Sequence, residues 1–84
     1  MKTAAQLLEM FTENRKPSFV ENDKTPAFFL SDKQTAWFLG QAASEGSGLT
    51  KIISYTHNGK SFCFQSLSGK KTKKSAYVTV RNIN

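Results

Sequence analysis

The chain has 84 residues, with 12 Lys and Arg against six Asp and Glu, and a formal net charge of +6. This length predicts one domain, residues 1–84, near the lower limit of what folds alone. A single cysteine excludes an internal disulfide, and no run of about 18 apolar residues is present to span a membrane. Glu9 interrupts the first ten residues before any stretch typical of a signal peptide, so we expect a cytoplasmic protein.

Positive charge is concentrated in the second half of the chain. Residues 1–45 hold five Lys or Arg and all six acids, whereas residues 46–84 hold seven Lys or Arg and no acid. This asymmetry favours an anionic partner, with nucleic acid as the main candidate. A small protein also carries net charge on its loops for solubility alone, which is the alternative interpretation.

A first helix is predicted over residues 3–14. Thr3 and Gln6 have the spacing of a capping box, in which each side chain bonds the other residue's backbone N–H. Apolar residues recur at helical spacing and predict one buried stripe, formed by Ala4, Leu7, Leu8 and Phe11. Glu9 and Glu13 fall on the opposite face with Gln6, where we expect them to be solvated.

The segment 15–29 is weakly patterned and contains Pro17 and Pro26. A structureless loop of this length is uncommon in a compact domain. Two interpretations follow: residues 18–20 pair briefly with a sheet edge, or Phe19 alone fills the core. Residues 27–30 are apolar and are expected to be buried on the approach to the next helix.

A second helix is predicted over residues 31–45. Ser31 and Gln34 form another capping-box pattern, Asp32 suits the first turn, and glycines after residue 45 end the helix. The predicted apolar arc consists of Ala36, Phe38, Leu39, Ala42 and Ala43.

Trp37 falls outside this arc, on the polar side of the second helix. One interpretation is that the first helix or the segment 15–29 covers the indole, with Gly40 permitting close approach. The other is that Trp37 contacts a protein partner, since tryptophan is enriched at interface hot spots.

Three antiparallel strands are predicted at about 50–57, 60–66 and 75–83. Asn58-Gly59 favours a type I′ turn between the first two, which pairs residue 57 with 60, 55 with 62 and 53 with 64. One sheet face then carries the large apolar side chains, namely Ile53, Tyr55, Phe62, Phe64, Val78 and Val80. The two helices are expected to cover this face.

The other face and the loop before the third strand combine hydroxyl groups, an aromatic ring and cations. Lysines contact phosphates, hydroxyls set the register of a backbone, and a tyrosine stacks on a base or sugar. The same pattern also occurs on ordinary solvated faces. The candidate nucleic-acid-binding residues are Lys51, Lys60, Lys70, Lys71, Lys73, Lys74, Tyr77 and Arg81.

The pattern of chemical groups argues against an enzyme. His57 is expected to be exposed beside the turn, and Cys63 lies opposite Ser54 rather than beside His57, so a Cys–His pair is disfavoured. One histidine and one cysteine do not supply a typical four-ligand zinc site. We therefore expect no catalytic residues, no metal and no cofactor.

The sequence predicts an α+β fold, in which two N-terminal helices pack on a three-stranded antiparallel β-meander. A winged helix would need a third helix, which residues 15–29 do not predict. The favoured function is a small non-enzymatic nucleic-acid-binding protein, for DNA or RNA. The alternative is a phage- or mobile-element-encoded inhibitor or adaptor that binds a host protein with an acidic surface, with Trp37 as a contact. No membrane partner is expected, and an exposed edge, such as that of the third strand, would pair two copies in a homodimer.

Overall fold

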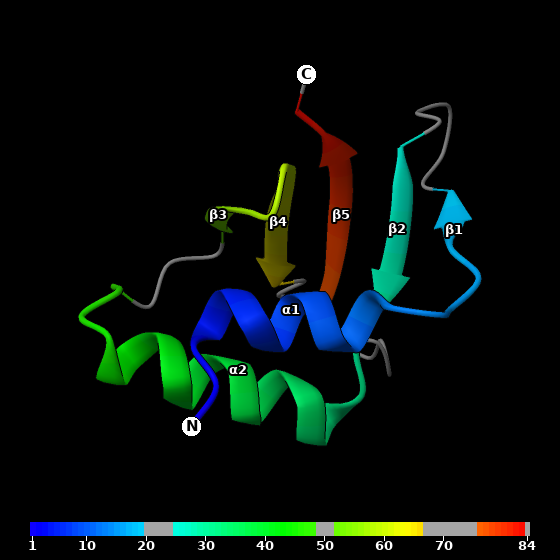
Figure 1. Ribbon diagram of the computed structural model, residues 1–84. Coiled ribbons are helices and arrows are strands. Elements are labelled where there is room, and N and C mark those ends of the chain that lie inside the picture. Colours follow the sequence, from blue (N-terminus) through cyan, green and yellow to red (C-terminus); the bar gives the residue numbers. More distant parts are fainter. Residues whose placement is uncertain (20–24, 49–51, 67–75, 84) are drawn as a thin grey trace.

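The computed structural model describes residues 1–19, 25–48, 52–66 and 76–83. Over these residues the fold is α+β, with two helices and a five-stranded antiparallel sheet of order β1-β2-β5-β4-β3 (Figure 1). In chain order the elements are α1 (Ala4–Thr12), β1 (Ser18–Phe19), β2 (Pro26–Phe29), α2 (Asp32–Ser44), β3 (Ile52–His57), β4 (Lys60–Ser66) and β5 (Ala76–Asn82).

The three predicted strands form an antiparallel meander as β3, β4 and β5. The sheet has two more strands, β1 and β2, so the prediction of a three-stranded sheet was wrong. β2 pairs with β5, and α2 lies between strands of one sheet rather than before them all. The predicted edge pairing of the segment 18–20 is confirmed for Ser18 and Phe19, which pair with Ala27 and Pro26; Val20 lies outside the described residues. Phe19 does not fill the core, because 59% of its surface is exposed.

The central position of β5 also corrects the expected homodimer edge. β5 pairs with β2 on one side and β4 on the other, so the third predicted strand has no open edge. The edge strands are instead β1 and β3.

The register predicted for the hairpin is confirmed. His57 pairs with Lys60, and the two turn residues Asn58 and Gly59 have φ of 52° and 74°, the left-handed region that a type I′ turn requires. Phe62 pairs with Val80 in β5. The valines and phenylalanines therefore share one face, as expected, and residues 50, 51 and 75 of the predicted strands lie outside the described residues.

The core lies between this apolar face and both helices. The predicted α1 stripe of Ala4, Leu7, Leu8 and Phe11 is buried. Phe38 of α2 packs on the same sheet face, with its ring centroid 4.6 Å from that of Phe64 and 6.0 Å from that of Tyr55. Both predicted capping boxes are present. Neither helix of the described chain is long and apolar enough to cross a membrane.

The α2 face is narrower than predicted. Phe38 and Ala42 are buried, but Ala36 and Ala43 are exposed, and Thr35 is buried in their place. Leu39, also in the predicted arc, is half-buried and packs against the core.

Candidate nucleic-acid interface

The sheet face opposite the helices, here called the outer face, is built by the alternation of β3, β4 and β5. The register places polar side chains in cross-strand rows: Arg81 beside Ser61 and Thr56, and Thr79 beside Cys63 and Ser54. These three strands hold no acid. The outer face therefore carries hydroxyl groups with a cation at one end, and the exposed Ile52 lies at the other end.

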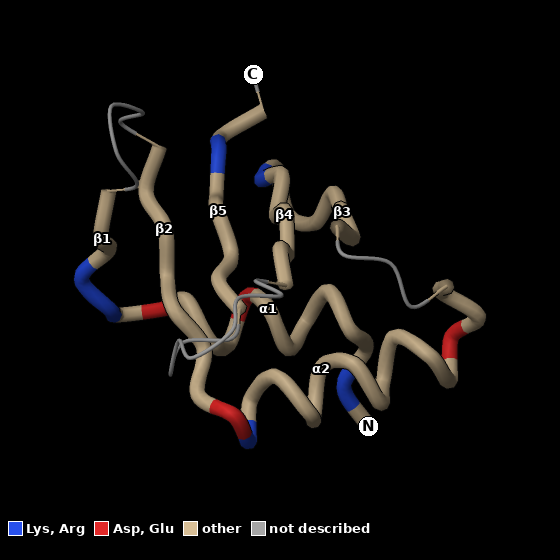
Figure 2. The backbone as a smooth tube through the Cα atoms, turned by 180° about the vertical axis from the view of Figure 1, so that it is seen from behind, with Lys and Arg blue, Asp and Glu red and all other residues tan. Residues whose placement is uncertain are grey.

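Two cations meet at that end of the sheet. Arg81 pairs with Ser61, and the neighbouring pair is Lys60 with Asn82, so the two cations are adjacent in the ladder but lie on opposite faces. Both residues are exposed. Figure 2 shows their blue segments side by side, where β4 begins and β5 nears its end.

Tyr77 is held on the outer face by two contacts. Its hydroxyl donates a hydrogen bond to Oε1 of Gln65, and its ring lies 5.7 Å from that of Phe29, at an interplanar angle of 52°. Tyr77 is half-buried. The contacts fix the ring in the surface, where only part of it can meet a ligand.

The remaining predicted cations, Lys51, Lys70, Lys71, Lys73 and Lys74, lie outside the described residues. The strand ends that flank the lysine-rich loop, Ser66 and Ala76, pair with each other at the opposite end of the sheet from Arg81. The structure thus brings together Arg81 and Lys60, with Tyr77 further along β5.

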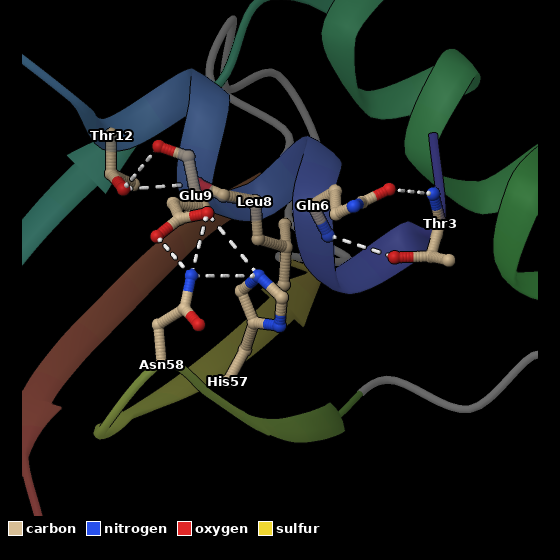
Figure 3. Close-up of polar contacts among 7 residues, drawn as sticks. All are labelled: Thr3, Gln6, Leu8, Glu9, Thr12, His57 and Asn58. Atoms are coloured by element: carbon tan, nitrogen blue, oxygen red, sulfur yellow. Dashed lines mark hydrogen bonds and ion pairs between the residues drawn. The ribbon is translucent and has the colours of Figure 1, made fainter. Parts of the chain in front are cut away.

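A polar cluster between α1 and the hairpin was missed from the sequence (Figure 3). Asn58 Nδ2 donates to Glu9 Oε2 at 3.1 Å, and His57 Nε2 lies 3.2 Å from Glu9 Oε1. The prediction that Glu9 is merely solvated was wrong, as was the exposed position of His57, which is half-buried. The helical period placed Glu9 correctly away from the stripe, but it could not show that the hairpin tip reaches this face.

The cluster changes the acidity of Glu9. The hydrogen bond from Asn58 is the main reason that the pKa of the Glu9 carboxyl lies below its usual range. Partial desolvation opposes this shift, and the charges of His57 and Lys60 reinforce it. The Glu9 carboxylate therefore links α1 to the hairpin of β3 and β4.

Cys63 and His57, the cysteine and the histidine of the chain, lie on opposite faces of the sheet. Cys63 pairs with Ser54 and so lies on the outer face, whereas His57 lies on the helix side, as the register predicted. Among the described residues, no three His, Cys, Asp or Glu side chains gather as potential metal ligands.

Trp37, the candidate protein contact, is 52% exposed. Its ring meets that of Phe11 edge-on, with centroids 5.7 Å apart, so α1 covers it in part. Gly40 plays no role in this contact, because a Cβ at that position would meet nothing within 4 Å. The predicted close approach at Gly40 was wrong.

Comparison with known proteins gives no match to the chain, either among family models or among curated proteins and solved structures.

Proposed function

We propose that the chain is a small non-enzymatic nucleic-acid-binding protein that holds a phosphate backbone along its outer sheet face. The observation that carries this proposal is the charge of residues 46–84, which hold seven Lys or Arg and no acid. These residues supply β3, β4 and β5, which form most of the sheet. A polyanion approaching them meets no carboxylate from their own sequence.

The outer face suits a backbone better than it suits base edges. Hydroxyl and cationic groups bind phosphate and sugar oxygens and position a strand, but they carry little sequence information. Arg81, Ser61 and Thr56 form such a row at one end of the face. Binding is therefore expected to show strong salt dependence and weak sequence preference.

A salt-varied titration tests the proposal. Fluorescence polarisation with mixed-sequence DNA and RNA would be measured at 50 and 200 mM salt. If about five cations contact phosphates, log K falls against log salt with a slope near −4.5, or roughly 500-fold over this range. The absence of binding at low salt, for both nucleic acids, would refute the proposal.

Arg81→Gln makes the test specific to the outer face. Loss of one phosphate contact should weaken binding to all sequences alike and reduce the salt slope by about 0.9. Lys33→Gln is the matched control, because Lys33 is exposed on α2 beside Asp32 and has the same formal charge. Equal effects of the two variants would show that only net charge matters.

A protein-binding inhibitor or adaptor is the second candidate, and the exposure of Trp37 favours it. A half-exposed indole anchored on Phe11 is a ready contact for a partner. A complex captured from nuclease-treated host lysate and weakened by Trp37→Ala would support this function. Capture that nuclease abolishes would instead indicate a nucleic-acid bridge.

A further inference from the structure

The helices cover only part of the sheet on their own side. In Figure 1, α1 crosses one end of the strands, while the opposite ends of β2, β4 and β5 project beyond it. The projecting ends are the start of β2 at Pro26, the start of β4 at Lys60 and the end of β5 at Asn82. The helices and the core beneath them therefore do not reach these strand ends.

An open hollow of about 690 Å³ occupies this uncovered corner. Pockets of this size accommodate small organic ligands. Its apolar wall consists of Phe28 and Val80 with two prolines, and Lys60 and Arg81 supply positive charge. The described lining residues include no acid and are Thr12, Pro17, Thr25, Pro26, Phe28, Lys60, Val80, Arg81 and Asn82.

Among the described residues, two negative groups that would oppose an anion here, at the end of α1 and at Glu9, are hydrogen-bonded. α1 ends at Thr12, where carbonyl groups would repel an anion, but Arg15 Nη1 donates to the carbonyl of Phe11 at 2.9 Å. Arg15 Nη2 donates to the carbonyl of Phe29, and its guanidinium lies 5.8 Å from the centre of the Phe28 ring. Glu9, which attracts Lys60, accepts a hydrogen bond from Asn58 and also contacts His57.

We infer that this hollow binds one nucleotide, with its phosphate at Lys60 and Arg81 and its base or sugar against Val80 and Phe28. Where the nucleotide belongs to a nucleic-acid strand, the inference rests on the proposed function. Arg81 links the two surfaces, because its strand position faces the outer side while it also lines the hollow. A nucleic-acid strand bound on the outer face would thus pass the end of β5 and place one unstacked nucleotide in the hollow.

Chemical-shift titration with adenosine 5′-monophosphate, adenosine and a mixed-sequence single-stranded DNA tests this site. The monophosphate should shift the amide signals of Phe28, Val80 and Asn82, and adenosine should do so less, because it lacks the phosphate. Lys60→Gln should weaken monophosphate binding about fivefold, the effect of losing one charge-assisted contact worth about 1 kcal/mol. Lys33→Gln should leave it unchanged.

A second variant fills the hollow without changing charge. Asn82 is exposed, so Asn82→Trp should preserve the fold while its indole occupies the space. Ala43→Trp places the same ring on the exposed side of α2 and is the matched control. If Asn82→Trp weakens the binding of both the monophosphate and the DNA, the hollow takes a nucleotide of a nucleic-acid strand. If it weakens only the monophosphate, the ligand is a free nucleotide.

The inference fails if the monophosphate moves none of these signals at millimolar concentration and neither Lys60→Gln nor Asn82→Trp weakens DNA binding more than its control. The unmodified protein's binding to DNA at low salt then decides separately whether the proposed function stands.

Discussion

Single side chains at the junction of α1 and the hairpin set how the two elements meet. Glu9 accepts hydrogen bonds from the amide of Asn58, so one carboxylate connects residues 49 positions apart. Glu45 also links distant parts of the chain, at the N-terminal end of α1. Its Oε2 accepts a hydrogen bond from the backbone N–H of Ala4 at 2.8 Å. A negative charge at a helix N-terminus is favourable. Two carboxylates thus orient α1 against the hairpin and α2.

The lowered pKa of Glu9 predicts a pH-dependent contribution to stability. Because the carboxyl is more acidic in the folded protein than its usual 4.5, its contribution is present above that value and is lost as the pH falls through the folded pKa. Urea unfolding should show Glu9→Gln less stable than the unmodified protein at pH 7, with the difference shrinking by pH 3. Glu13→Gln should show a smaller effect at pH 7. A Glu9→Gln deficit that is constant with pH would contradict this prediction.

The hydroxyl group of Thr35 gives a second prediction. Its hydroxyl is buried and has no hydrogen-bond partner among the described residues. Thr35→Val should raise the free energy of unfolding by about 1 kcal/mol, because it removes an unsatisfied polar group. Thr12→Val is the control and should not stabilise, since the Thr12 hydroxyl donates to the carbonyl of Leu8 at 2.9 Å. Chemical denaturation measures both, and a less stable Thr35→Val protein would refute the account.

The elements that were predicted well each show two sequence patterns that indicate the same structure. The α1 stripe coincides with a capping box, and β3 and β4 alternate around an Asn58-Gly59 turn that fixes their register. β2 was missed because its four residues, Pro26–Phe29, do not alternate in polarity and begin with a proline. Such a run is indistinguishable from a buried loop until its partner, β5, is known.

The candidate site was only partly predictable for a related reason. Alternation identified the outer face and the place of Arg81 on it. The hollow depends on how far α1 extends over the sheet and on Phe28, whose strand was not predicted. The contact of Glu9 with Asn58 depends on the angle between a helix and a hairpin, which no local pattern encodes.

Two glycines with opposite roles give an element-scale prediction. Gly59 has φ of +74°, so Gly59→Ala should strain the turn and lower the free energy of unfolding by about 1–2 kcal/mol. Gly40 lies inside α2 in open space, so Gly40→Ala should raise it by up to about 1 kcal/mol. Thermal and urea unfolding of both variants provide the check. Equal effects would mean that the turn conformation does not limit stability.

Over the whole molecule, the free energy of local opening should be highest near β5 and should fall toward the edge strand β1. The middle of the sheet holds the fully buried Phe62, Phe64 and Val78, whereas β1 has two exposed residues. Amide hydrogen exchange should be slowest at these three core residues and much faster in β1, because local opening there exposes little apolar surface. Equal protection in β1 and β5 would contradict this gradient.

The position of β5 in the sheet has a consequence for biosynthesis. β5 follows all the other strands in the sequence but joins β2 to β4, so the two parts of the sheet meet only after it has left the ribosome. Until then Phe28 of β2 has no neighbouring Val78, and the apolar sides of both helices lack much of their sheet. Contacts this distant in sequence form late and slowly. The nascent chain should therefore remain open to chaperones, and to aggregation, until β5 has emerged from the ribosome.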